Sequence, residues 1–347
     1  MNEILPYLSP GEILKYFNME PLNRIVRQGK LKPGISSVLE QLSLWDYLST
    51  IPRKHLHDPK YLQHYHNTAL KIANKLVAEG LLSPVGTSSG IYQKYIGNGY
   101  NGSKAENGYY DFLIYGFAEV AAYFKDAVRV LEVVDPDTKD VHVGTGFAVR
   151  FNKKQYLVTA RHCLPKNNEI RLKIFLGFGD GYSYPEKIYV HVNDNVDIAV
   201  LEFSDMMMVS DRFFSLEEPN LLDDILVSGY PPIPGTREAV LVSSKGEITA
   251  FGKSYFHDYE QLYVNANVKA GSSGSPIINA TGSVVGIIFE SARDTKNKEL
   301  QDELRFGTGH SSVLIKDILC SINTAGGADH KELKFTATES KSFIILE

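Results

Sequence analysis

The sequence predicts an all-β domain of two β-barrels that follows a mainly helical N-terminal domain. The chain has 347 residues, which is enough for about two domains. Apolar residues recur with helical spacing in the first third, whereas short apolar strands alternate with turns after about residue 125. A histidine, an aspartate and a serine stand beside such strands in segments 156–164, 196–203 and 271–276. This spacing suits one barrel that carries the histidine and aspartate and a second that carries the serine.

Residues 1–115 are predicted to form the helical domain. The strongest helix runs from about Asp58 to Leu82, where Leu70, Ile72, Ala73, Leu76 and Val77 form an apolar stripe. Shorter amphipathic helices are expected at 10–18 and 36–50. Two β-like stretches, 90–96 and 109–115, flank a Gly/Asn/Ser-rich tip at 97–107, and a connecting helix is expected at 117–125. A helix followed by a hairpin resembles a winged helix.

A winged helix could bind nucleic acid, but a regulatory role with a protein partner is the preferred interpretation for residues 1–115. Lysines and arginines exceed acidic residues by only three in this region, 12 against 9, which does not indicate a polyanion partner. The candidate nucleic-acid contacts are Lys71, Lys75, Lys94 and Lys104. Metal binding is not expected from His55, His57, His64 and His66, because positions 64 and 66 point to different faces of a helix.

Residues 116–323 are predicted to form the β domain. Segments 127–134 and 141–151 are β-rich, and a hairpin turn is expected at 152–155. Strands are also expected at 276–279 and 283–289, joined by a turn, and a helix at 313–322 closes the domain. Residues 324–347 form a C-terminal tail that could add a strand, dock on the N-terminal domain or occupy a groove.

Three residues carry the chemistry of this domain. The segment Thr159-Ala160-Arg161-His162-Cys163 ends an apolar strand, and Asp197 opens another. Gly271-Ser272-Ser273-Gly274-Ser275-Pro276 sets a serine between glycines, which let the backbone turn sharply. The chain order His162, Asp197, Ser273 is that of the chymotrypsin-type triad. Asp194 is a second candidate for the aspartate.

On these motifs, residues of about 125–320 resemble the trypsin-like (chymotrypsin-fold) serine protease family, particularly bacterial high-temperature-requirement proteases and glutamyl endopeptidases. The resemblance implies that Ser273 is the nucleophile, His162 the general base and Asp197 the group that orients the imidazole. The backbone amides of Gly271 and Ser273 would form the oxyanion hole. The expected substrate-binding residues are Asn267, Phe289, Glu290, Ser291 and His310.

Two departures from the family pattern are informative. Ser272 stands where digestive and clotting proteases carry the aspartate that receives a new N-terminus, so that route of activation is not expected. In the family, the cysteine after the histidine pairs with one on the neighbouring strand. Here the only other cysteine is the distant Cys320, so both thiols are expected to be reduced.

The expected function is a cytoplasmic serine endopeptidase without cofactor or metal, gated by its N-terminal domain or a partner. The first residues lack a basic region followed by an apolar run, and no apolar stretch approaches the length of a membrane span. The competing interpretation is a catalytically silent protease fold that serves as a binding scaffold. Substrate preference is not readable from the sequence.

Overall fold

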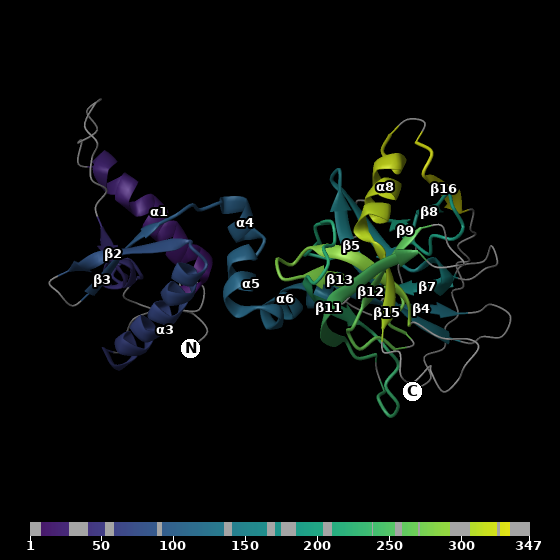
Figure 1. Ribbon diagram of the computed structural model, residues 1–347, viewed down its shortest axis with the longest axis horizontal. Helices are drawn as coiled ribbons and strands as arrows, with labels where there is room; N and C mark the ends of the chain where they lie inside the picture. The colour runs from purple at the N-terminus through teal and green to yellow at the C-terminus, as the bar shows by residue number, and fades with distance from the viewer. Residues whose placement is uncertain are drawn as a thin grey trace. The chain divides into compact units, whose positions relative to one another are not determined.

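A computed structural model describes residues 8–27, 41–52, 59–88, 92–134, 141–164, 171–174, 185–203, 210–237, 239–253, 259–269, 271–291, 306–324 and 327–333. The chain divides into two compact units, Met1–Gly116 and Phe117–Glu347 (Figure 1). None of the described helices is long and apolar enough to cross a membrane.

The N-terminal unit combines helices with a three-stranded sheet. Its elements in chain order are α1 (Pro10–Arg27), β1 (Leu42–Ser43), α2 (Leu44–Leu48), α3 (Pro59–Ala78), β2 (Leu82–Ser88), β3 (Tyr92–Gly97), α4 (Gly102–Glu106) and α5 (Tyr109–Tyr115). The strand order in the sheet is β1-β3-β2. A capping box at Ser43 and Asp46 starts α2, since each side chain accepts a hydrogen bond from the other residue's backbone amide.

The core of this unit forms around the predicted helical stripe. On α3, Ala69, Ile72, Ala73 and Leu76 are at most 3% exposed, at the i, i+3, i+4, i+7 spacing of one helix face. They pack with apolar residues of α1, α2 and the sheet, namely Ile13, Leu14, Phe17, Leu42, Leu48, Leu82 and Tyr95. The unit therefore has a hydrophobic core of its own.

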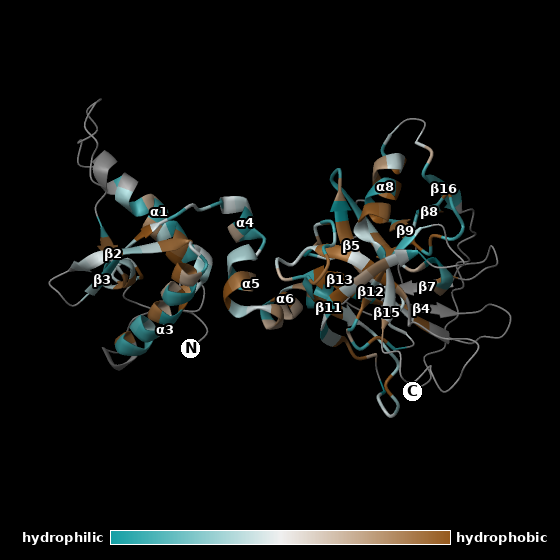
Figure 2. Ribbon diagram, viewed as in Figure 1, coloured by the Kyte–Doolittle hydropathy of each residue, from teal (hydrophilic) through white to brown (hydrophobic). Residues whose placement is uncertain are grey.

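One predicted strand of this unit is wrong. Residues 109–115 form the helix α5, and the predicted hairpin tip contains α4; the observed hairpin is β2–β3. Tyr110, Phe112 and Ile114 are buried at a spacing of two, which mimics the alternation of a strand. The segment is helical because Gly108 adopts a left-handed conformation that starts the helix, and Lys75 Nζ donates to the Ile114 carbonyl at its end. Figure 2 shows the hydrophobic character of α5.

Two of the four candidate nucleic-acid contacts have partners inside the protein. Lys75 donates to Ile114, and the Lys104 ammonium lies 4.3 Å from the centre of the Tyr109 ring, in α4 and not on a wing. Of the four histidines, His55 and His57 lie outside the described residues. His66 stacks on Trp45, and His64 packs edge-on against Tyr65. Among the described residues, no cluster of three or more His, Cys, Asp or Glu could hold a metal.

The C-terminal unit confirms the all-β prediction. After α6 (Phe117–Phe124), a seven-stranded sheet has the order β16-β8-β9-β6-β5-β4-β7. Its strands are β4 (Val128–Val134), β5 (Val141–Phe151), β6 (Lys154–Thr159), β7 (Arg171–Ile174), β8 (Lys187–His191), β9 (Ala199–Glu202) and β16 (His330–Leu333). The turn between β5 and β6 is the predicted hairpin, in which Asn152 and Lys153 have positive φ.

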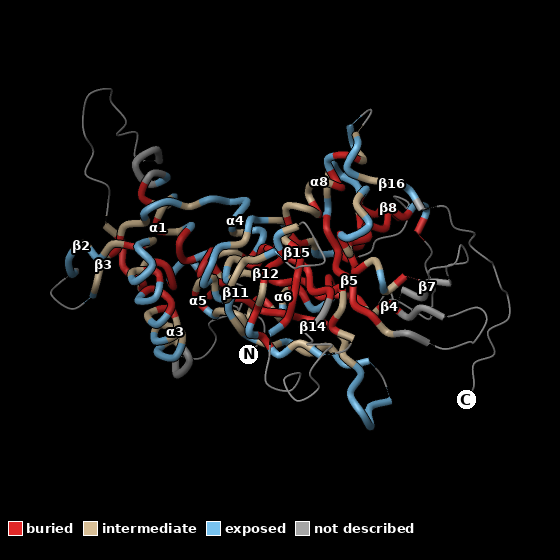
Figure 3. The backbone as a smooth tube through the Cα atoms, turned by 45° about the vertical axis from the view of Figure 1, so that its right-hand side comes forward, coloured by how far each residue is buried: buried red, intermediate tan, exposed pale blue. Residues whose placement is uncertain are grey.

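The second sheet closes into a barrel of order β10-β11-β12-β15-β14-β13. Its strands are β10 (Asp224–Gly229), β11 (Val242–Lys253), β12 (Glu260–Val264), β13 (Pro276–Asn279), β14 (Val284–Ser291) and β15 (Gly307–Ser311). Helix α8 (Ser312–Ile322) follows β15 and buries Ile315, Ile318 and Leu319. Buried residues follow the strands of both sheets in Figure 3.

The start of the C-terminal tail adds a strand to the first sheet. β16 pairs antiparallel with β8, with His330 opposite His191. Ser321 of α8 contacts the His330 ring and accepts from the Asp329 amide, which ties this strand to the helix. The rest of the tail, including the apolar segment 343–346, lies outside the described residues.

Candidate active site

The strand pairing of the first sheet brings His162 to Asp197. β6 pairs with β9 so that Thr159 lies opposite Ala199. The chain beyond Thr159 forms a short 3-10 turn, Arg161–Cys163, and the chain before Ala199 contains Asp197. The Arg161 amide donates to the Asp197 carbonyl at 3.4 Å. His162 follows the end of β6 and Asp197 precedes the start of β9. Because these two strand ends are neighbours, the two residues lie close together.

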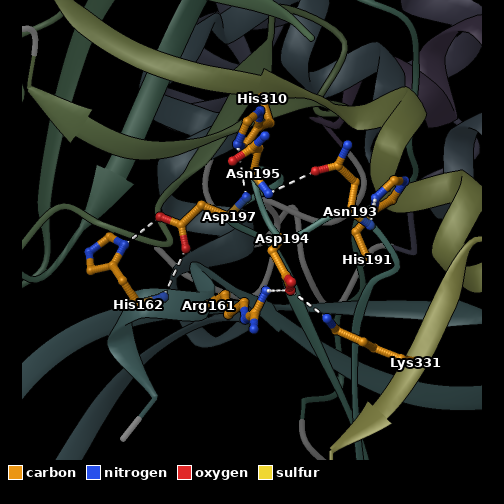
Figure 4. Close-up of polar contacts among 9 residues, drawn as sticks. All are labelled: Arg161, His162, His191, Asn193, Asp194, Asn195, Asp197, His310 and Lys331. Atoms are coloured by element: carbon orange, nitrogen blue, oxygen red, sulfur yellow. Dashed lines mark hydrogen bonds and ion pairs between the residues drawn. The ribbon is translucent and has the colours of Figure 1, made fainter. Parts of the chain in front are cut away.

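Asp197 holds His162 by two contacts (Figure 4). One carboxylate oxygen accepts from the His162 backbone amide at 2.8 Å, and the other contacts Nδ1 of the ring. The hydrogen bond to Asp197 raises the pKa of His162 to about 10. The contact orients the ring by Nδ1, and Nε2 lies 4.0 Å from Cys163 Sγ. This is the arrangement in which a carboxylate orients a general base.

The Ser273 turn is shaped by two glycines. Gly271 and Gly274 have φ of +87° and +84°, a region that side chains rarely adopt. A Cβ on Gly274 would lie 1.9 Å from the Thr145 carbonyl oxygen, and one on Gly271 would lie 2.4 Å from Cδ of Pro232. Both positions thus need glycine for conformation and for space.

Thr145 of β5 fastens this turn to the first sheet. Its amide donates to the Ser273 carbonyl at 3.0 Å, and its hydroxyl lies 3.3 Å from the Gly271 carbonyl. Thr145 is completely buried, and its own carbonyl accepts from the Thr159 hydroxyl at 2.7 Å. The sequence analysis missed this role, because it placed Thr145 only within the β-rich segment 141–151.

The Cys163 thiol lies near both His162 and the backbone of Ser273. The Cys163 thiol lies 3.7 Å from the Ser273 carbonyl oxygen and 4.0 Å from His162 Nε2. The Ser273 hydroxyl donates to the Phe289 carbonyl at 3.1 Å. Both cysteines, Cys163 and Cys320, are free thiols, as predicted.

The predicted oxyanion donors are available in this turn. The amides of Ser272, Gly274 and Ser275 donate to the carbonyls of Lys269, Ile288 and Ser272 respectively. The amides of Gly271 and Ser273 are not among those that bond to other described residues. These two amides are the groups expected to receive the charge of a tetrahedral intermediate.

The two candidate aspartates have different partners. Asp194 accepts from Arg161 Nη1 at 2.7 Å and from the Lys331 ammonium of β16, and its side chain is 68% exposed. Lys331 and then Arg161 lower the pKa of Asp194 to about 2. Asp197, with 23% of its side chain exposed, faces His162 instead.

The residues expected to bind substrate differ in burial. Asn267 is exposed, in the loop before the Ser273 turn, and its amide donates to Ser244 Oγ. Phe289 is buried, so its carbonyl and not its ring meets Ser273. Glu290 and Ser291 continue β14 opposite Thr308 and Gly307 of β15, and their side chains are outside the description.

His310 lies behind Asp197 and not in a pocket. It is completely buried, and its Nε2 accepts from the Asp197 amide at 3.0 Å. Its ring stacks on Phe289 with the centroids 4.3 Å apart. The sequence analysis had named it among the substrate-binding residues, a role for which a completely buried side chain offers no contact surface.

Comparison with known proteins now identifies the domain. Residues 144–287 match the family model of the trypsin-like peptidase domain. This part of the chain is therefore similar to a trypsin-like peptidase domain. The match begins in β5 and ends in β14, so it includes every strand end that bears a triad candidate.

The curated relatives of this peptidase domain are named as serine proteases. A probable periplasmic serine endoprotease, DegP-like, of Chlamydia pneumoniae is 27% identical over 155 residues, which is 44% of this chain and 29% of that protein. A protein of the same name from Rhizobium meliloti is 30% identical over 146 residues, 42% of this chain and 27% of that protein. The chain thus spans less than a third of the length of these relatives.

A solved structure is similar to part of the chain. The active form of the Rv3671c protease of Mycobacterium tuberculosis is 21% identical, with a TM-score of 0.45, and covers 60% of this chain and 86% of its own.

The relatives correct one expectation. The DegP-like relatives are named periplasmic, which contradicts the cytoplasmic location predicted from the sequence. That prediction depended on the absence of a recognisable leader in the first residues, which says nothing about the environment to which the peptidase domain is adapted.

Proposed function

We propose that the peptidase domain hydrolyses peptide bonds with Ser273 as nucleophile, His162 as general base and Asp197 as the orienting carboxylate. The observation that carries the proposal is the double contact of Asp197 with the amide and ring of His162, beside the Ser273 turn. The relatives named as serine proteases support the same reaction.

The reaction follows from these groups. For this reaction the Ser273 hydroxyl, which donates to the Phe289 carbonyl in the structure, has to turn away from that carbonyl and toward His162 Nε2. The oxygen attacks the peptide carbonyl carbon while its proton moves to Nε2, and the amides of Gly271 and Ser273 bind the resulting oxyanion. The C–N bond then breaks, and the imidazolium gives its proton to the leaving amine. Water, deprotonated by His162, cleaves the acyl-enzyme and returns Ser273 to its starting form.

The substrate is a peptide that pairs with the end of β14. Residues 289–291 lead away from the nucleophile as a strand, so an extended peptide can add to them by backbone hydrogen bonds. Asn267 is exposed in the loop that leads to the Ser273 turn and can contact a substrate side chain. Glu290 and Ser291 belong to the strand that receives the peptide.

The N-terminal unit is assigned a regulatory role through a protein partner. It forms a compact unit with a separate hydrophobic core, and no triad candidate belongs to it. Two of its candidate nucleic-acid lysines already bind within the unit, which favours a protein partner over a nucleic acid.

Intact-mass analysis after treatment with a fluorophosphonate tests the catalytic assignment. We expect one adduct on the natural protein, none on Ser273→Ala, and one on the neighbouring control Ser272→Ala. An adduct that persists in Ser273→Ala would refute the assignment of the nucleophile. The same assay on residues 117–347 tests regulation, because gating by the N-terminal unit predicts a changed labelling rate. Absence of an adduct on both proteins would instead favour the silent scaffold.

A further inference from the structure

A buried histidine lies directly behind the proposed triad. His310, in the middle of β15, is completely buried. Its Nε2 accepts a hydrogen bond from the backbone amide of Asp197 at 3.0 Å, across 113 positions of sequence (Figure 4). Buried polar groups of this kind are retained when they are hydrogen-bonded, since desolvation otherwise disfavours them.

The direction of this hydrogen bond defines which nitrogen of the His310 ring carries a proton. The Asp197 amide can only donate, so Nε2 of His310 has to be without a proton. The ring is then neutral with its proton on Nδ1, because a neutral imidazole has one nitrogen that accepts and one that carries the proton. A neutral buried ring offers an acceptor of fixed position, and the rigid strand β15 holds it there. The backbone of Asp197 is thereby fixed just before its side chain reaches His162.

One face of the same ring stacks on Phe289 of β14. The His310 and Phe289 rings are stacked at 4.3 Å with an angle of 21° between their planes. The Phe289 carbonyl accepts from the Ser273 hydroxyl. One buried side chain therefore touches both the aspartate backbone and the residue that positions the serine.

We propose that His310 is a positioning residue of the triad, which fixes Asp197 through its amide and packs on Phe289, whose carbonyl holds the Ser273 hydroxyl in its resting position. The inference extends the proposed function, because it assigns the support of the same three side chains. It replaces the role in a substrate pocket that the sequence suggested for His310.

Two substitutions at this position separate the hydrogen bond from packing. His310→Phe keeps an aromatic ring against Phe289 but removes the acceptor, whereas His310→Gln places its amide oxygen near the position of Nε2. Since small displacements of catalytic groups can cost about 100-fold in rate, we expect His310→Phe to slow fluorophosphonate labelling by roughly 10- to 100-fold. His310→Gln should stay within about threefold of the natural protein, because it keeps the acceptor for the amide.

Ile225→Ala is the matched control for lost stability. Ile225 is completely buried in β10 and lies opposite Asn279, the end of β13 remote from the nucleophile. Its truncation lowers the melting temperature without reaching the triad, so the labelling rate should be unchanged. Equal slowing of labelling in His310→Phe and His310→Gln, or no slowing in His310→Phe, would overturn the proposal.

A second measurement is independent of catalysis. The ring protons of His162, assigned by comparison with His162→Ala, give its pKa by NMR in each full-length variant. Loss of the Asp197 contact should bring the pKa of His162 down toward its ordinary value in His310→Phe but not in His310→Gln. If the natural protein is not labelled, the proposed function fails, while this contrast still supports the positioning role. An unchanged His162 pKa in His310→Phe would overturn it.

Discussion

The free thiol of Cys163, beside the proposed general base His162, leads to a specific prediction. Cys163 packs against Gly144 of β5, and a Cβ placed on Gly144 would lie 2.9 Å from Cys163 Sγ and 3.2 Å from its Cβ. The Cβ atoms of a disulfide are typically about 3.5–4.5 Å apart, so a shift of a few tenths of an ångström accommodates the bond. We expect Gly144→Cys to form a disulfide with Cys163.

The magnitude follows from the length of the closed loop. Positions 144 and 163 enclose about 20 residues, for which loop closure stabilises a protein by roughly 3 kcal/mol in the chain-entropy model. In a unit of this size each kcal/mol shifts the melting temperature by about 2–4 °C. The oxidised variant should therefore melt roughly 6–12 °C above the same variant after reduction, less the strain of the short Cβ separation.

The assay counts thiols and then measures melting. The natural chain has two cysteines, so the reduced variant has three, and alkylation after denaturation should give three adducts when reduced and one, on Cys320, when oxidised. Gly144→Ser adds a side chain of similar size without sulfur, and its melting should not depend on reductant. Two outcomes for Gly144→Cys would refute the contact between Gly144 and Cys163: three reactive thiols after oxidation, or a melting temperature that is the same with and without reductant.

Three further predictions concern the triad and its turn. Gly274→Ala forces a Cβ to within 1.9 Å of the Thr145 carbonyl oxygen at a φ of +84°. It should therefore lower the free energy of unfolding, measured by chemical denaturation, by about 2–4 kcal/mol. An unchanged denaturation midpoint would contradict this prediction. Asp197→Asn should slow fluorophosphonate labelling by about 10⁴-fold. Asp194→Asn should leave the labelling rate within about threefold of the natural protein, since Asp194 bonds to Arg161 and Lys331 and not to the imidazole. Equal losses in the two variants would contradict the choice of Asp197 as the orienting carboxylate. Asp197 raises the pKa of His162 to about 10, so the ring keeps its proton to higher pH. Because only the neutral ring is a base, the labelling rate should rise with pH through neutrality. A labelling rate that already reaches its plateau near pH 6.5 would contradict this prediction.

The strands that carry the triad could be predicted because their signals are local. Apolar runs and turn residues delimit β13 and β14, and the predicted turn, 280–282, lies within the four residues between them. Gly271 and Gly274 also gave a local signal, because glycine is favoured where the backbone needs a positive φ. The order of histidine, aspartate and serine along the chain indicates the fold because that order differs among unrelated folds with the same geometry.

The N-terminal error has the opposite cause. The spacing of Tyr110, Phe112 and Ile114 is that of a strand, but the segment lies against the α1 and α3 core as a helix. The Ile114 carbonyl near its end accepts a hydrogen bond from Lys75 of α3, a residue 39 positions away that the local sequence does not indicate. Propensity and period are weak where tertiary contacts decide the conformation.

The location of His310 also depended on long-range partners, but a signal was present. Along β15 and the start of α8, Thr308, His310 and Ser312 are polar yet buried, at 6%, 0% and 0% exposure. Burial of such groups is tolerated only with hydrogen-bond partners: Asp197 supplies one for His310, and the Glu217 carbonyl supplies one for Ser312. A polar residue at every second position of a segment that closes an apolar barrel therefore marks contacts with other segments. In this chain one of those contacts reaches the residue that orients the proposed base, so the buried polar positions, and not only the exposed ones, are the places to look for residues that support the reaction.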